Sequence, residues 1–189
     1  MARTARFVSG ITRLPLMAVP LFLIVGAAAA GWEGVLWALL CLLLTSGLSL
    51  AYLIYLTRSG RVRDPEKISR EERVRPLRVV AGLHVAAFVL VTLLGAPEEL
   101  RAVLLSYALA TTAFALLIPF VNLSLHAAGA TGALACLILV FGVRGMLFVP
   151  VLPLVWWART ALGRHTYSEL ALGTMVGGGL TWFAFAMIA

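Results

Sequence analysis

Three residues toward the carboxyl end of the chain combine types and a spacing that suit phosphate chemistry. Five residues separate Arg159 from His165, and three more separate His165 from Glu169. Arginine grips phosphate oxygens with paired hydrogen bonds, and a neutral imidazole is a competent nucleophile near neutral pH. A carboxylate four residues further along a helix accepts the other ring N–H and orients the histidine. The spacing therefore predicts a histidine nucleophile with its own orienting acid.

A second polar cluster interrupts the long apolar stretch 102–143. It consists of Asn122, Ser124 and His126, and we expect it to open a helix. The backbone N–H groups at a helix N-terminus bind anions, so the start of this helix is a candidate anion site. His126, in the same turn, is a candidate general acid for a leaving oxygen. An alternative is that His126 is a polar helix start without chemistry.

The segment 58–78 is strongly basic, with eight Lys and Arg against four acidic residues. We expect it to be a cytoplasmic loop. It contains Lys67, Arg70, Arg73 and Arg75. An alternative is a solvated amphipathic segment that lies on anionic lipid.

The composition identifies the medium in which these side chains must work. Of the 189 residues, 62% are hydrophobic and 12% are charged, whereas soluble domains are about half apolar and a quarter charged. This excludes a soluble enzyme, a disordered tail and a disulfide scaffold. The net charge of +7 indicates membrane topology rather than a nucleic-acid partner. Cys41 and Cys136 lie in apolar stretches and predict neither a disulfide framework nor a thiolate metal site.

Charge-free windows predict an all-α polytopic bundle of six to seven spans, forming one integral membrane domain over 1–189. A span needs about 20 apolar residues, and the 42-residue fourth window is read as two helices broken near 122–126. With that window divided, the segment Gly145–Ala158 is the sixth of seven. It is short for a span, and we expect its helix to continue past Arg159. The windows are Leu14–Trp32, Gly34–Thr57, Val79–Pro97, Ala102–Val143, Gly145–Ala158 and Leu170–Ala189.

Seven spans place all three polar clusters on one face of the membrane. All but two of the 15 Lys and Arg residues fall on that face, the exceptions being Arg101 and Arg144. Basic residues collect on the cytoplasmic side. We therefore expect a protein of the cell membrane with its N-terminus and its site facing the cytoplasm.

The motifs resemble those of the type 2 phosphatidic acid phosphatase superfamily. Its third motif reads Ser-Arg, five residues, His, three residues, Asp, and here Ala158-Arg159 leads to His165 and Glu169. Its second motif, Pro-Ser-Gly-His, corresponds to Leu123-Ser124-Leu125-His126. The resemblance is strong over 120–175. It is weak over 58–78, where Lys67 and Arg75-Pro76 are one residue further apart than in the family's first motif.

The resemblance implies a lipid-phosphatase-like core and a metal-independent phosphatase without cofactor. Its substrate would be a lipid phosphate or a polyprenyl diphosphate drawn from the membrane lipids. His165 would form a phosphohistidine, His126 would protonate the leaving group and then activate water, and Glu169 would orient His165. The phosphate would be held by Arg159, Ser124, Lys67 and the arginines Arg70, Arg73 and Arg75.

The departures from the motifs leave alternatives open. Glu169 replaces the family's Asp, and the Gly of motif 2 and the Ser of motif 3 are absent, which also suits a non-catalytic protein that binds lipid phosphate. A prenyl-diphosphate transferase would need paired aspartates for magnesium, and Asp64 is the chain's single aspartate. Thr166-Tyr-Ser-Glu169 also fits a capping box that starts the last helix, and Arg159 and Arg164 could be anchors at the membrane edge.

Overall fold

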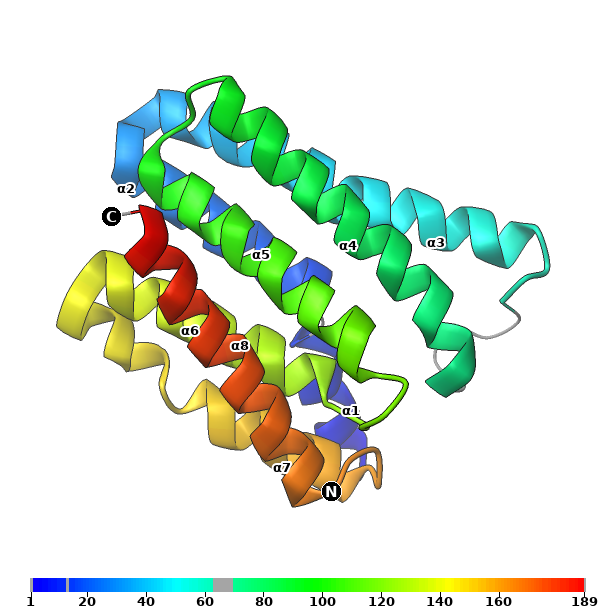
Figure 1. Ribbon diagram of the computed structural model, residues 1–189. Coiled ribbons are helices and arrows are strands. Elements are labelled where there is room, and N and C mark those ends of the chain that lie inside the picture. The colour runs from blue at the N-terminus through cyan, green and yellow to red at the C-terminus, as the bar shows by residue number, and fades with distance from the viewer. Residues whose placement is uncertain (1, 13, 63–69, 189) are drawn as a thin grey trace.

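The computed structural model describes residues 2–12, 14–62 and 70–188, and these form helices joined by short turns, with no strand among them (Figure 1). Lys67 lies outside the described residues. The helices are α1 (Ala2–Ile11), α2 (Leu14–Leu42), the π-helix η1 (Leu43–Gly47), α3 (Leu48–Arg58), α4 (Arg70–Leu93), α5 (Glu98–Leu117), α6 (Leu125–Phe141), the 3₁₀ helix η2 (Gly142–Phe148), α7 (Val151–Ala161) and α8 (Tyr167–Ile188). The predicted all-α class is confirmed.

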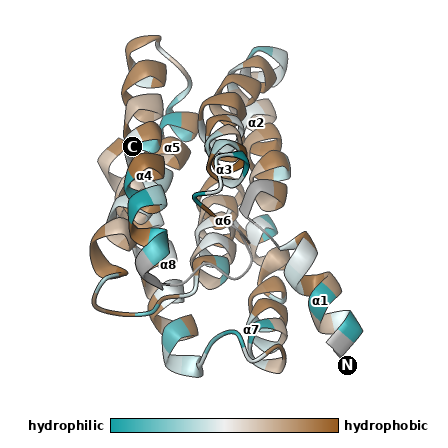
Figure 2. Cartoon of the chain, turned by 90° about the vertical axis from the view of Figure 1, so that its right-hand side faces the viewer, coloured by the Kyte–Doolittle hydropathy of each residue, from teal (hydrophilic) through white to brown (hydrophobic). Residues whose placement is uncertain are grey.

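Five helical stretches in the described part of the chain are long and apolar enough to cross a membrane. They are Leu16–Arg58, Glu72–Leu93, Glu98–Leu117, Leu125–Phe148 and Tyr167–Ile188. Hydrophobic residues cover most of their length, and hydrophilic residues concentrate near the helix ends and on α1 (Figure 2). An integral membrane bundle is therefore the architecture that the helices support.

The first of these stretches folds back on itself. Ala30 and Gly31 leave the helical conformation, and Gly31 has a φ of +55°, which glycine adopts at little cost. A Cβ added to Gly26 would lie 2.3 Å from the carbonyl oxygen of Gly34, although eight residues of straight helix span about 12 Å. The chain thus makes a tight hairpin, close to the break predicted near residue 33.

The predicted sixth segment is a composite of two helix types. At Gly142, with φ +59°, the chain turns, and η2 then runs back along α6 so closely that a Cβ on Gly145 would lie 2.3 Å from the carbonyl oxygen of Leu137. Seven residues of 3₁₀ helix rise about 14 Å and the eleven residues of α7 about 16 Å. Neither helix alone reaches the roughly 30 Å thickness of a hydrocarbon core.

Two predicted boundaries need correction. The basic loop 58–78 is shorter than expected, because residues 70–78 form the first turns of α4. Arg and Glu are good helix formers, and Pro76 removes only one backbone hydrogen bond. Ahead of the first predicted window, which begins at Leu14, residues 2–11 form the separate helix α1, which the windows did not predict.

The helix α8 packs mainly against α6 and α5, and α4 packs against α5 (Figure 1). His84 of α4 is buried between helices, with Nε2 3.4 Å from Ser49 Oγ and Nδ1 3.2 Å from Thr111 Oγ1. His84 therefore makes polar contacts with residues of both α3 and α5.

Candidate functional site

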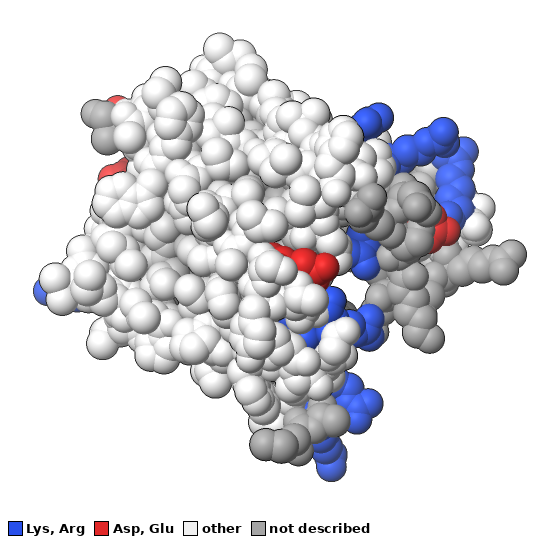
Figure 3. Space-filling view, turned by 60° about the horizontal axis from the view of Figure 1, so that its bottom comes forward, with Lys and Arg blue, Asp and Glu red and all other residues white. Residues whose placement is uncertain are grey.

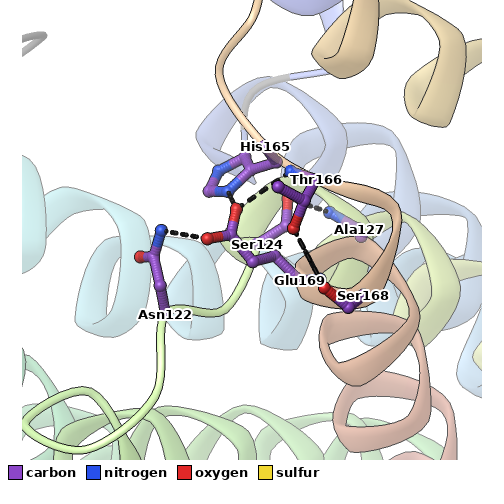
Figure 4. A network of polar contacts seen from close by, with 7 residues as sticks. All are labelled: Asn122, Ser124, Ala127, His165, Thr166, Ser168 and Glu169. Carbon is purple, nitrogen blue, oxygen red and sulfur yellow. Dashed lines mark hydrogen bonds and ion pairs between the residues drawn. The ribbon is translucent and has the colours of Figure 1, made fainter.

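Glu169, in the first turn of α8, connects three segments of the chain (Figure 4). Its Oε2 accepts hydrogen bonds from His165 Nδ1 at 3.0 Å and from the Thr166 backbone N–H at 3.1 Å. Its Oε1 accepts from Asn122 Nδ2 at 2.7 Å. One carboxylate therefore fixes the α7–α8 turn, the start of α8 and the loop before α6.

The local sequence explains why Glu169 stands there. The Thr166 hydroxyl accepts a hydrogen bond from the Glu169 N–H at 3.4 Å, while the Glu169 carboxylate returns to the Thr166 N–H. This reciprocal arrangement is the predicted capping box, and it is confirmed. Because the same carboxylate also bonds His165, capping and histidine orientation are combined in one side chain.

The histidine presents one defined nitrogen for chemistry. A carboxylate only accepts hydrogen bonds, so Nδ1 of His165 carries the proton and Nε2 carries the lone pair. Nε2 lies on the ring edge away from Glu169 (Figure 4). Only 7% of the His165 side chain is exposed, so the ring is held in position with little contact to water. This is the geometry that an imidazole nucleophile requires.

Charge and burial keep His165 neutral. Burial is the largest influence and lowers the pKa of His165 below its usual 6.5, and the hydrogen bond to Glu169 opposes it. The positive charges of Arg159 and Arg73 lower the pKa further, because like charges disfavour protonation. Two arginines from α7 and α4 therefore act on the same imidazole.

Ser124 forms the junction between α6 and α8. Its backbone N–H donates to the Glu169 carbonyl oxygen at 3.2 Å, and its Oγ accepts from the Ala127 N–H at 3.3 Å. The side chain is fully buried, so in this structure its hydroxyl caps α6. His126 is half-buried and lies in the first turn of α6, two residues after Ser124.

Glycines let α6 and α8 meet at backbone distance. A Cβ on Gly173 would lie 2.5 Å from the Ser124 carbonyl oxygen, and one on Gly177 would lie 2.1 Å from that of Ala128. Small residues permit such close approach between membrane helices. The position of Ser124 beside Glu169 therefore depends on Gly173.

Replacing Gly173 with alanine is expected to destabilise the bundle by roughly 1–3 kcal/mol, because backbone atoms cannot yield as a flexible side chain does. Gly179→Ala is the matched control: it lies on the same helix, and its Cβ would meet nothing within 4 Å. Thermal unfolding in detergent measures both variants. Equal melting temperatures would contradict the close α6–α8 contact.

The predicted phosphate-binding residues differ in where they lie. Arg159 lies in the last turn of α7, and its Nη1 donates to Ser9 Oγ of α1 at 2.9 Å. Arg73 is half-buried, whereas Arg75 is exposed and lies about 200° further around α4. Arg70 is the first residue of α4, and its side chain lies outside the described part. Arg73 is therefore the α4 candidate that acts on His165.

Arginine side chains gather at the end of the bundle that holds this site, bordering a recess with acidic atoms, and the opposite end shows few charges (Figure 3). The three predicted polar clusters thus share one end. Among the described residues, no three His, Cys, Asp or Glu side chains come together as a metal site.

The sequence did not predict that Asn122 and Ser9 belong to the candidate site. Asn122 appeared only as a polar interruption, although a polar residue at membrane depth is itself a signal of function. Ser9 carries no signal in the sequence, since a single hydroxyl in a short helix is unremarkable.

Comparison with family models, curated proteins and solved structures found no match to this chain.

Proposed function

We propose that the protein is an integral membrane phosphatase that hydrolyses a lipid phosphate or a polyprenyl diphosphate through a phosphohistidine on His165. The observation that carries the proposal is the 3.0 Å bond from His165 Nδ1 to Glu169, which leaves Nε2 as a nucleophile. Arg159 and Arg73 supply positive charge around it. The resemblance of these motifs to the type 2 phosphatidic acid phosphatases supports the same reading.

The chemistry proceeds in two displacements. Nε2 attacks phosphorus, a P–N bond forms, and the bond to the leaving oxygen breaks while that oxygen takes a proton from His126. Water, deprotonated by His126, then attacks the phosphohistidine, and the P–N bond breaks to return His165 and release phosphate. Arginines near the phosphoryl oxygens stabilise charge in both transition states, and Glu169 stabilises the cationic imidazole.

The surroundings favour a substrate with an apolar tail. The site stands at one end of helices long and apolar enough for a membrane, so the bilayer delivers the tail while the head reaches the basic end. If basic residues mark the cytoplasmic side, the substrate belongs to the inner leaflet of the cell membrane.

One observation favours a second function, a non-catalytic protein that binds lipid phosphate. The Ser124 hydroxyl is fully buried in its cap and is not presented to a substrate. Binding would then rest on the arginines and the start of α6.

The test is release of inorganic phosphate by the purified full-length protein in EDTA. The panel contains phosphatidate, diacylglycerol diphosphate, a prenyl monophosphate and a prenyl diphosphate. Release from at least one lipid in EDTA is expected. A requirement for magnesium would overturn the mechanism, and saturable binding of these lipids without release would establish the second function.

The pH profile gives an independent check on His165. Because its pKa lies below 6.5, kcat/KM should fall only as the pH drops below that value, where the nucleophile becomes protonated. Arg73→Gln removes a charge that opposes protonation, so it should move this acidic limb to higher pH. Arg75→Gln, on the other side of α4, should leave the limb in place. A limb that Arg73→Gln does not move would contradict the placement of Arg73.

A further inference from the structure

The ten-residue helix α1 presents three different faces. Ala5, Ser9 and the following Thr12 are buried, and α1 packs against α7. Phe7 and Ile11 are 66% and 51% exposed. Arg3 and Arg6 are also exposed, on the remaining side. An inner polar face, an outer apolar face and a basic face thus share one short helix.

The inner face of α1 reaches the candidate site directly. Ser9 Oγ, in a residue that is 8% exposed, accepts a hydrogen bond from Arg159 Nη1 at 2.9 Å. Hydrogen bonds to charged groups are stronger than neutral ones, so this contact limits where the guanidinium lies. Arg159 also closes the turn toward His165, because its carbonyl oxygen accepts from the Arg164 N–H at 3.0 Å.

The outer faces of α1 match the surface of a membrane. Ten residues of helix span about 15 Å, too short to cross a bilayer. The helix α1 comes directly before α2, the first membrane-length helix, and lies at the basic end of the bundle (Figures 1 and 3). Exposed apolar side chains beside arginines are typical of helices that lie among anionic lipid headgroups.

We infer that α1 lies on anionic lipid at the bilayer surface and, through Ser9, holds Arg159 in position for the phosphate. Ser9 is then a positioning residue, and the lipid composition controls how well Arg159 is placed. This inference rests on the proposed function, in which Arg159 binds the substrate's phosphoryl group.

Ser9 is tested with two substitutions in the full-length protein. Ser9→Ala should lower kcat/KM by about tenfold, the effect of one lost hydrogen bond to a charged group, and should move the acidic limb of the pH profile in the same direction as Arg159→Gln. Ser9→Thr keeps the hydroxyl and should restore both. In the Arg159→Gln background, Ser9→Ala should have no further effect. Independent, additive effects would overturn the role of Ser9.

The lipid is tested in phosphatidylcholine vesicles with and without phosphatidylglycerol, at a constant mole fraction of substrate. Phosphatidylglycerol should raise the wild-type activity, and Arg3→Gln with Arg6→Gln should reduce this response by up to about fivefold per arginine. Arg101→Gln with Arg144→Gln is the matched control, since it removes two arginines that lie outside both α1 and the basic segment 58–78. An equal loss in both double variants, or no response to phosphatidylglycerol, would overturn the lipid contact.

Binding of inorganic phosphate, measured by calorimetry, separates the failure of this inference from that of the proposed function. If the wild type binds phosphate without hydrolysing lipids, and Ser9→Ala weakens that binding, the inference holds and the catalytic proposal fails. If hydrolysis occurs but Ser9→Ala matches the wild type, the inference alone fails. A wild type that neither binds nor hydrolyses would overturn both.

Discussion

Replacing His165 with alanine is expected to lower phosphate release by about four orders of magnitude, the usual effect of deleting a nucleophile that works with its own orienting group. The loss should be complete at every pH, because no other imidazole can take its place at the end of the Glu169 contact. The measurement is kcat/KM on the lipid that the wild type hydrolyses fastest, in EDTA.

A trapping experiment shows whether the loss of activity in His165→Ala comes from the loss of the phosphohistidine intermediate. Wild-type protein quenched during turnover of phosphorus-labelled lipid should carry label that survives base and is released by acid, as a phosphohistidine does. His165→Ala should carry none, whereas His126→Ala should still carry label, because it keeps the nucleophile while both the formation and the hydrolysis of the intermediate become slower. Labelled His165→Ala protein, or release that persists without His165, would place the nucleophile elsewhere.

Glu169→Gln is expected to have the second-largest effect, lowering kcat/KM by about three to four orders of magnitude with little change in shape. The carboxylate accepts from His165 Nδ1, Thr166 N–H and Asn122 Nδ2, and an amide can serve only part of this set. With an amide N–H facing Nδ1, the histidine favours the tautomer with its proton on Nε2, so the nucleophilic lone pair is lost. An unpaired donor should also cost about 1–3 kcal/mol of folding free energy.

Thr166→Val separates catalysis from capping. It removes the hydroxyl that accepts from the Glu169 N–H and leaves the contact between Glu169 and His165 intact. Unfolding should become easier by about 1 kcal/mol, as for other lost helix caps, while kcat/KM stays near that of the wild type. If Thr166→Val reduced activity as much as Glu169→Gln, the carboxylate would matter only for starting α8.

The sequence predicted the parts of the fold and site that depend on local spacing. A separation of four residues suffices to place Glu169 next to His165, although His165 lies before the first residue of α8 and not on the helix as predicted. The capping box follows from the spacing of Thr166 and Glu169. Long apolar windows are enough to predict membrane-length helices. The shared end of the polar clusters follows from counting these windows.

The remaining features depend on contacts between distant segments, which spacing does not encode. Asn122 reaches Glu169 across 47 positions, and Ser9 reaches Arg159 across 150. The choice of Arg73 over Arg75 required knowing that the helix α4 begins before them. Apolar windows also cannot distinguish a 3₁₀ helix from an α-helix, so η2 and α7 together were predicted only as one short segment.

The shared use of Glu169 has a consequence for how the protein is assembled at the ribosome. In chain order, Glu169 follows Ser9, Arg73, Asn122, Ser124, His126, Arg159 and His165. During synthesis the arginines and both histidines are therefore complete before the carboxylate that sets the reactive tautomer. Since α8 packs against both α5 and α6, its insertion would complete these helix contacts and bring the Glu169 carboxylate to His165, so a partly translocated chain would remain inert toward the lipids around it.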